Sequence, residues 1–209
     1  MRQGELFPTA IAAGARGAEL PLRSHQLQAW QERVATFQAP LFAASGERGD
    51  GNSGQGELFG SSDAMPARPA GRPTGAGHNP EGVDPLGLQP QALSFWRWHQ
   101  APQQGAALYF VVDRPPHLAG ALLLYVGETG RADRRWKGEH DCKSYLAAYG
   151  EALQRAQLEA RLTIRFWLDV PTAIRPRRAL EQALIRRWRP PFNKESRSRW
   201  ATPFQAEPE

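Results

Sequence analysis

Apolar and polar positions alternate in different ways along the chain, and each pattern predicts an element. Two apolar, partly β-branched runs at 107–113 and 121–128 are joined by the proline-containing segment 114–120, which predicts a β-hairpin. The stretch 161–171 alternates and ends at a proline, which predicts a third strand.

Helical spacing of apolar residues follows these strands. It predicts a helix over 144–160, interrupted at Gly150, and a helix over 175–188 that ends at the prolines beyond it. The segment 131–146 is expected to turn into a further helix. The predicted order β-β-α-α-β-α indicates an α+β fold, a small domain over 105–200 with a three-stranded antiparallel sheet flanked by helices.

The N-terminal half carries one comparable helical pattern. Leu27, Trp30, Val34 and Phe37 follow helical spacing, and Ser24 suits the N-cap of that helix. The helix either docks on the main domain or serves a partner, and docking is the commoner arrangement.

Glycine and proline mark the segment between this helix and the domain. Ten of the 20 glycines fall within 44–85, a stretch with almost no aliphatic residues to offset the entropy of ordering it. We therefore expect a largely disordered N-terminal region. The expected divisions are a tail with one helix (1–43), a disordered linker (44–85), a lead-in packed on the domain (86–104) and a C-terminal tail (201–209).

Charge and cysteine content narrow the class of protein. The net charge is +5; residues 1–100 carry 8 basic and 9 acidic side chains, and residues 101–209 carry 18 and 12. A basic domain suits a polyanionic partner, although charge runs are also common on plain solvated surfaces. Cys142 is the only cysteine, which excludes an intramolecular disulfide and favours a reducing, cytoplasmic location. No apolar run approaches the roughly 20 residues of a membrane helix, so no membrane partner is expected.

Residues in the predicted strands, helices and final loop resemble, in order and spacing, the motifs of the GIY-YIG nuclease family: Tyr109, the run Tyr125-Val126-Gly127, Arg135, Glu181 and Asn193. The resemblance covers about 105–195. The first motif departs from the family pattern, because Ala107 replaces its glycine. His140 lies one residue beyond the position where many relatives carry a histidine or tyrosine.

The resemblance implies a metal-dependent endonuclease. It implies that Glu181 holds one divalent cation, Mg²⁺ or Mn²⁺, and that Arg135 contacts the phosphate. Tyr109 is the candidate for activating the attacking water, with His140 as a candidate assistant and Tyr125 as the second tyrosine of the site.

The residue types suit this chemistry. A carboxylate on a helix can hold one Mg²⁺ that keeps most of its waters, and a guanidinium matches phosphate oxygens bidentately. Tyrosines on neighbouring strands can face one pocket because inward positions alternate with period two. Gly127 is expected to let the substrate approach the backbone closely, and Asn193 to fix the end of the last helix or the metal site.

Taken one at a time, the same residues also fit plain structural roles. Tyrosines in strands are usually packing residues, an isolated arginine, histidine or glutamate is usually on the surface, and an asparagine after PPF can cap a turn.

Basic and aromatic residues around the motifs suit a nucleic acid. Phosphate contacts are expected from Arg131, Arg134, Lys137 and Lys143, and from Arg177, Arg178, Arg186, Arg187 and Arg189 on the last predicted helix. Trp136 and Trp200 either stack on unpaired bases or, as is commoner, pack on the domain.

A short motif recurs in the N-terminal half. Gln3–Phe7 and Gln55–Phe59 both read QGELF, and Gln38–Phe42 shares the form Q-x-x-L-F. The motif resembles the peptides with which bacterial replication and repair proteins bind the sliding clamp. A Leu-Phe pair can fill an apolar pocket while the glutamine fixes its orientation. Duplication within a low-complexity tail is the alternative.

The expected function is therefore hydrolysis of DNA phosphodiester bonds at branched, flapped or damaged structures, in repair or recombination at the nucleoid, with RNA as an alternative substrate. No zinc finger or helix-turn-helix is apparent that would read a long specific sequence. The alternatives are a nucleic-acid-binding module that does not cleave, and an accessory protein recruited by a sliding clamp.

Overall fold

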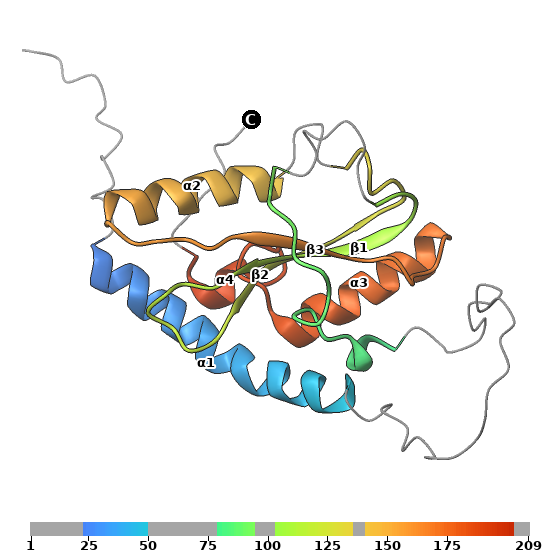
Figure 1. The fold of residues 1–209 in the computed structure, drawn as a ribbon, viewed down its shortest axis with the longest axis horizontal. Coiled ribbons are helices and arrows are strands. Elements are labelled where there is room, and N and C mark those ends of the chain that lie inside the picture. The colour runs from blue at the N-terminus through green and yellow to red at the C-terminus, as the bar shows by residue number, and fades with distance from the viewer. Residues whose placement is uncertain (1–22, 50–78, 95–102, 136–140, 203–209) are drawn as a thin grey trace, which may run out of the picture.

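The computed structural model describes residues 23–49, 79–94, 103–135 and 141–202. Within them the elements run in the order α1 (Ser24–Gly49), a 3₁₀ helix η2 (Pro80–Gly82), β1 (Ala107–Asp113), β2 (Leu122–Thr129), α2 (Asp141–Arg155), β3 (Thr163–Trp167), α3 (Ile174–Trp188) and α4 (Arg197–Trp200) (Figure 1).

The strands form one three-stranded antiparallel sheet in the order β2-β1-β3, which confirms the predicted α+β class. The central strand β1 is buried along its whole length. Odd-numbered side chains of 107–111 pack in the layer that contains α2, and even-numbered side chains of 108–112 pack in the layer that contains α3. The two helices therefore cover opposite faces of the sheet (Figure 1).

A β-bulge interrupts the alternation of β2. Val112 pairs with Leu123, whereas the residue before Val112 pairs with Tyr125, so Leu124 is left over in the ladder. Leu124 and Tyr125 consequently both face the α2 layer. The bulge brings Tyr125 to the same face of the sheet as Tyr109.

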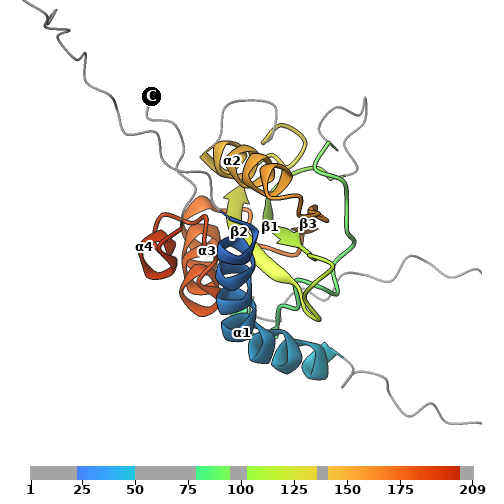
Figure 2. The ribbon, with the colours of Figure 1, turned by 90° about the vertical axis from the view of Figure 1, so that its left-hand side faces the viewer.

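Helix α1 docks on the domain and lies along the free edge of β2 (Figure 2). Gln38 is buried at this edge. Its side-chain oxygen accepts a hydrogen bond from the Leu123 N–H (2.8 Å), and its Nε2 donates to the carbonyls of Leu123 (3.0 Å) and Trp188 (3.1 Å). A carboxamide thus satisfies backbone groups that an edge strand leaves unpaired.

The ends of α1 differ from the prediction. The Arg23 carbonyl accepts the first helical hydrogen bonds, and the Arg23 N–H donates to Oε1 of Gln26 (2.8 Å). Arg23 is therefore the N-cap, in half of a capping box, and the assignment of Ser24 was wrong by one residue. The helix continues through Pro40 to Gly49 and bends along its length, as a proline inside a helix requires (Figure 2).

The segment 79–94 packs on the domain before the first strand. Arg165 on β3 donates from Nη1 to the carbonyls of Leu86 and Leu88, the latter at 2.8 Å. Gln91 forms an isolated antiparallel bridge with a residue of β3. The described part of the predicted lead-in, 86–94, thus contacts β3.

The predicted linker was too long at both ends. Residues 44–49 are helical and 79–85 belong to the packed lead-in, because the helix and Val83 bury apolar surface on the α3 layer. The remaining parts of the predicted tails, linker and lead-in lie outside the described residues. None of the helices that the structure describes combines the length and the apolar composition that crossing a bilayer needs.

Between β2 and β3 the described residues contain one helix, α2, where two were predicted. It passes through Gly150 without interruption. It ends where Gln157 adopts a φ of 58° and the Leu158 N–H bonds to the Leu153 carbonyl (2.8 Å), a Schellman arrangement. The short helix α4 was not predicted.

Candidate active site

Two tyrosines and an arginine form a hydrogen-bonded chain on the α2 face of the sheet. The rings of Tyr109 (β1) and Tyr125 (β2) stack with centroids 6.0 Å apart, and their side chains are hydrogen-bonded to each other. Arg135 donates from Nε to the Tyr109 hydroxyl (3.3 Å). Because a guanidinium only donates, the Tyr109 hydroxyl keeps its own proton for Tyr125.

A turn after β2 positions Arg135. The N–H groups of Arg134 and Arg135 both donate to the Arg131 carbonyl (3.1 Å each). The Ala132 N–H donates to the Gly105 carbonyl (2.8 Å), which ties the turn to the start of β1. The guanidinium therefore approaches Tyr109 from a segment that is anchored on the same strand.

The two tyrosines differ in their access to solvent. Tyr109 is 0% exposed, whereas Tyr125 is partly exposed and lines a pocket. Burial, reinforced by Tyr125, raises the pKa of Tyr109 well above its usual 10, and Arg135 offsets only part of this rise. Burial also raises the pKa of Tyr125. Both phenols are therefore protonated at neutral pH, and Tyr125 rather than Tyr109 is the one that can meet a water.

Gly127 makes room for Tyr109. The two residues pair across the strands, and a Cβ on Gly127 would clash with Cζ and the hydroxyl of Tyr109 and lie 2.8 Å from Cε1 of Tyr125. The Tyr109 ring therefore fills the space that was expected to serve a close approach of the substrate. The glycine is needed for the placement of the tyrosine pair.

Glu181 reaches the same region from α3. Burial, together with the neighbouring Glu128 and Glu195 carboxylates, raises the pKa of Glu181 from 4.5 to about 7. A hydrogen bond from the Glu128 N–H and the positive charge of Arg135 act in the opposite direction. Glu181 in turn contributes to the raised pKa of Tyr125. The structure thus brings together four residues that the sequence predicts for one site: Tyr109, Tyr125, Arg135 and Glu181.

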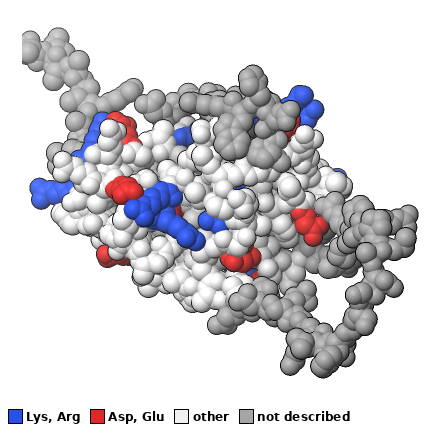
Figure 3. Space-filling view, in the orientation of Figure 1, with Lys and Arg blue, Asp and Glu red and all other residues white. Residues whose placement is uncertain are grey.

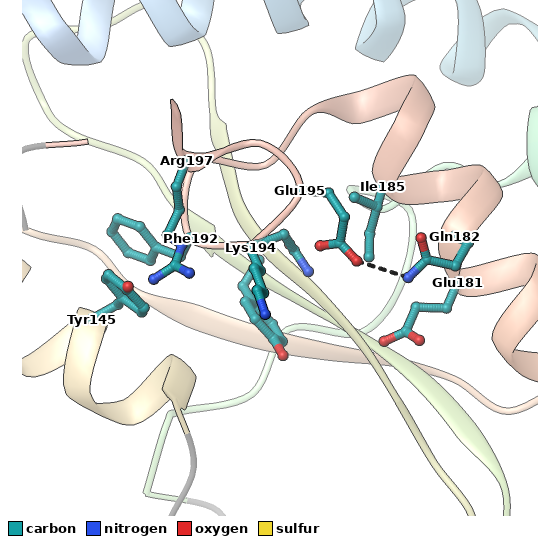
Figure 4. A pocket seen from close by; sticks show the side chains of 10 residues that line it. Tyr145, Glu181, Gln182, Ile185, Phe192, Lys194, Glu195 and Arg197 are labelled. Atoms are coloured by element: carbon teal, nitrogen blue, oxygen red, sulfur yellow. Dashed lines mark hydrogen bonds between the residues drawn. The ribbon is translucent and has the colours of Figure 1, made fainter. Parts of the chain in front are cut away.

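A pocket of about 200 Å³ opens beside this group. Tyr125 and Glu181 line it, together with the first turns of α2 and the loop after α3. Figure 4 shows Glu181 and Gln182 on one side, Arg197, Phe192 and Tyr145 on the other, and Lys194 between them. Gln182 donates from Nε2 to a carboxylate oxygen of Glu195 (2.9 Å).

Asn193 ties the loop after α3 to β2. Its Oδ1 accepts the Val126 N–H (2.9 Å) and its Nδ2 donates to the Val126 carbonyl (2.8 Å). The Phe192 N–H donates to the Leu124 carbonyl (3.0 Å). Asn193 and Gln38 thus each bond the backbone N–H and carbonyl of one residue of β2. Together, Phe192 and Asn193 fix the backbone on both sides of Tyr125.

Carboxylates are the candidate metal ligands of this region. Among the described residues, no group of three or more His, Cys, Asp or Glu side chains is arranged to hold a metal. Glu128 is paired with Arg177 (2.8 Å) and Arg178 (3.3 Å), and the carboxylates that line the pocket are Glu181 and Glu195. Mg²⁺ bound by one carboxylate keeps several waters, and the pocket has room for them.

The predicted phosphate contacts are only partly available. Arg131 and Arg134 are exposed after β2, where Arg134 pairs with Asp133 (3.5 Å), and Lys143 is half-buried on α2. Lys137 and His140, like Trp136, lie outside the described residues. On the face seen in Figure 3, basic and acidic side chains are interspersed among larger uncharged areas.

Two arginines of α3 with predicted phosphate contacts form hydrogen bonds within the domain. Arg177 is buried, pairs with Glu128 and donates to the carbonyls of Pro171 (3.2 Å) and Thr172. Arg187 donates to the Pro80 carbonyl (3.1 Å) and to a hydroxyl of α1. Arg178, Arg186 and Arg189 are exposed.

Two further predictions are decided by packing. Trp200 is buried, donates from Nε1 to the Arg189 carbonyl (2.6 Å) and packs edge-on against Phe37, so the packing alternative is confirmed. Gln38–Phe42, the third Q-x-x-L-F motif, is part of α1. Gln38 is buried at the β2 edge and the Phe42 ring lies 4.6 Å from Trp188, so this copy is committed to the domain's own core.

Several charged residues of the site were missed from the sequence: Glu128, which acts on the Glu181 carboxyl, and Lys194, Glu195 and Arg197, which line the pocket. Glu128 follows Gly127 directly, and the other three lie within four residues of Asn193. Their closeness in the sequence to Gly127 and Asn193 was the one signal by which they could have been found. Whether a loop side chain turns into a pocket depends on backbone pairing that no local pattern encodes.

In comparisons with known protein family models, with curated proteins and with solved structures, nothing matches this chain.

Proposed function

We propose that the chain is a metal-dependent endonuclease of the GIY-YIG type that hydrolyses phosphodiester bonds of DNA. One observation carries the proposal: Tyr109, Tyr125, Arg135 and Glu181 come from two strands, a turn and a helix, yet they interact with one another beside one pocket. These are the residues whose order and spacing resemble the family motifs. Each alone fits a plain structural role, and their meeting at one place supports a common one.

Glu181 would hold Mg²⁺ or Mn²⁺, which supplies a Lewis acid for a phosphate oxygen. Tyr125 presents its hydroxyl to the pocket. Its raised pKa keeps the phenol protonated, so it orients the attacking water by a hydrogen bond rather than removing a proton from it. Tyr109 holds Tyr125, and Arg135 holds Tyr109 while it adds positive charge near the reacting phosphate.

Exposed cations around α3 support a nucleic-acid substrate. Arg175, Arg178, Arg186, Arg189, Lys194 and Arg199 are all exposed on α3 or in the residues that follow it. Such residues contact phosphates without reading sequence, which suits recognition of a DNA structure in repair or recombination. Action on chromosomal DNA would place the protein in the cytoplasm at the nucleoid.

The test is a cleavage panel of labelled branched, flapped, damaged and linear DNA, with RNA counterparts, in Mg²⁺ and in Mn²⁺. We expect cleavage of at least one structured DNA by the parent chain and none by Glu181→Gln. Glu151→Gln, at an exposed carboxylate on α2 that pairs with Arg155, is the matched control and should cleave normally. Cleavage by Glu181→Gln at the parent rate would refute the proposal. Tight binding without any cleavage would favour the non-cleaving binding module.

A sliding clamp is the second proposed partner. With Gln38–Phe42 committed to the core, the proposal rests on the two QGELF copies, Gln3–Phe7 and Gln55–Phe59. A labelled peptide of residues 1–10 should bind a bacterial clamp, and Leu6→Ala with Phe7→Ala should abolish that binding. Equal binding by the substituted peptide would exclude clamp recruitment and leave local duplication as the origin of the repeat.

A further inference from the structure

The pocket beside Glu181 has a second, positively charged wall. Lys194 lines it from the loop after α3 and Arg197 from the start of α4. Figure 4 shows Arg197 across the pocket from Glu181, with Lys194 between them. Among the residues that the structure describes, neither cation forms an ion pair, although Glu181 and Glu195 line the same pocket. Unpaired cations and an unpaired carboxylate that face one another across a pocket suit a ligand that carries both a metal ion and an anion.

The backbone that carries these two cations is fixed to β2, and the Arg197 side chain is held as well. Asn193 is bonded to both backbone groups of Val126, and its carbonyl accepts the N–H groups of Ser196 (2.9 Å) and Arg197 (3.1 Å). The Arg197 guanidinium lies 5.0 Å from the centre of the Tyr145 ring, a cation–π contact that keeps it half-buried at the wall. Little ordering is therefore left for Arg197 to undergo when it binds an anion.

The cations of the pocket are distinct from the arginine of the tyrosine chain. Arg197 lies across the pocket from Glu181, and Lys194 lies between them (Figure 4). Arg135 is instead bonded to the Tyr109 hydroxyl and is not among the residues that line this pocket.

We propose that Lys194 and Arg197 form an anion subsite for a backbone phosphate of the substrate strand that flanks the scissile phosphate. This inference rests on the proposed function for the identity of the anion. A flanking phosphate carries the same charge before and during the reaction, so the subsite contributes to binding and to the placement of the strand rather than to the chemical step. Tyr145 and Phe192 form the apolar floor beside it, where their rings stack at 5.7 Å.

The first test measures affinity without cleavage. A fluorescein-labelled forked DNA is titrated with the full chain in Ca²⁺, across a series of salt concentrations. Lys194→Gln and Arg197→Gln should each weaken binding by about tenfold, as the loss of one charge-assisted hydrogen bond implies. A plot of log affinity against log salt has a negative slope, and each substitution should make that slope less steep by about 0.9. Arg155→Gln, at an exposed arginine in the last turn of α2, is the control and should change neither quantity.

Arg197→Lys separates charge from packing, because Arg197 also contacts Tyr145. The Arg197→Lys variant keeps the positive charge, so it should retain the parent salt dependence even if its contact with the Tyr145 ring is weaker. A parent-like slope in both glutamine variants would overturn the subsite.

The second test locates the phosphate. Single phosphates of the fork are replaced by neutral methylphosphonates, one position at a time. In the parent chain, neutralising one position should weaken binding most. In the double variant Lys194→Gln with Arg197→Gln, neutralising that position should have no further effect. If the loss of affinity from neutralising a phosphate adds to the loss from the side-chain substitutions at every position, the inference is overturned. So would a loss of kcat at saturating substrate with unchanged affinity, since that result would place the cations on the scissile phosphate.

These outcomes are independent of the test of the proposed function. Parent-like cleavage by Glu181→Gln refutes the nuclease mechanism, whereas the binding measurements in Ca²⁺ decide the subsite by themselves.

Discussion

The Tyr109 and Tyr125 side chains share a face and a hydrogen bond, but only one of them reaches the pocket. Tyr109 is enclosed between Arg135, Phe166 and the backbone at Gly127, whereas Tyr125 is partly exposed opposite Glu181. A buried phenol can position a neighbour but cannot touch a water. In the proposed nuclease, Tyr125 would therefore contact the nucleophile and Tyr109 would position Tyr125.

Phenylalanine substitutions should separate these two roles. If the proposed function holds, Tyr125→Phe removes the hydroxyl that would contact the nucleophile and should lower kcat by about 100-fold, within the range of acid–base and orienting groups. Tyr109→Phe removes a positioning hydrogen bond and should lower kcat by about tenfold with little change in KM. Single-turnover cleavage at saturating DNA measures both. An equal or larger loss for Tyr109→Phe would reverse the assignment.

The pKa of the Glu181 carboxyl falls in the physiological range. Its pKa of about 7 means that, below this value, a cation must displace a proton to bind. Affinity for Mn²⁺ should therefore rise about tenfold per pH unit up to about pH 7 and level off above it, so that it is about 30-fold weaker at about pH 5.5. Calorimetric titration across this range measures the profile.

A matched variant isolates this titration. Glu181→Gln should bind Mn²⁺ weakly and with no inflection near pH 7. A parent affinity that is flat from about pH 5.5 to about pH 8.5 would remove Glu181 as the ligand.

The residues of the site were predictable because their types and spacing are local properties of the sequence. Their connections were not. The bond from Arg135 to Tyr109 depends on the turn anchored at Gly105, and the raised pKa of Glu181 depends on its burial beside Glu128 from another element. Such contacts arise only when segments distant in the sequence pack together.

At the scale of elements, the strands were predicted closely because apolar alternation and a bounding proline mark them. The bulge at Leu124 was not, since LLLYV reads as one continuous apolar run that fits either register. The run of α1 through Pro40 was also missed, because local propensity disfavours proline inside a helix and the packing of Phe42 on Trp188 overrides it. Tertiary contacts decided both features.

Gly127 and Gly150 differ in what a side chain would meet, and this gives a paired stability prediction. A Cβ at Gly127 would clash with Tyr109, whereas one at Gly150 in α2 has no neighbour within 4 Å. Gly127→Ala should therefore lower the free energy of unfolding by about 3 kcal/mol, and Gly150→Ala should raise it by about 0.5–1 kcal/mol. Denaturant unfolding of both variants checks the pair. A neutral Gly127→Ala would mean that Tyr109 can leave its position over the strand.

At the scale of the whole molecule, the N-terminal helix is part of the domain. Leu27, Trp30 and Val34 are buried in the same core as Tyr109. A buried polar chain adds to this, in which Gln31 of α1 donates to the Tyr149 hydroxyl and Tyr149 donates to Asp113 of β1 (2.7 Å). The sequence showed the amphipathic helix but not its site, because the edge of β2 exists only once the sheet has formed.

Gln38 is where this helix joins the sheet, and a one-atom change tests its role. Gln38→Glu keeps the shape but replaces the Nε2 donor with an oxygen that faces the carbonyls of Leu123 and Trp188. We expect a loss of about 3 kcal/mol in the free energy of unfolding, because buried carbonyls lose their donor and a carboxyl is buried among acceptors. Gln28→Glu, the same change at a partly exposed position of the same helix, should be within about 0.5 kcal/mol of the parent. Comparable unfolding curves for the two variants would show that α1 is held by its apolar contacts alone. A selective loss in Gln38→Glu, together with weaker cleavage, would show that the edge of β2 must be closed for Tyr125 to face Glu181.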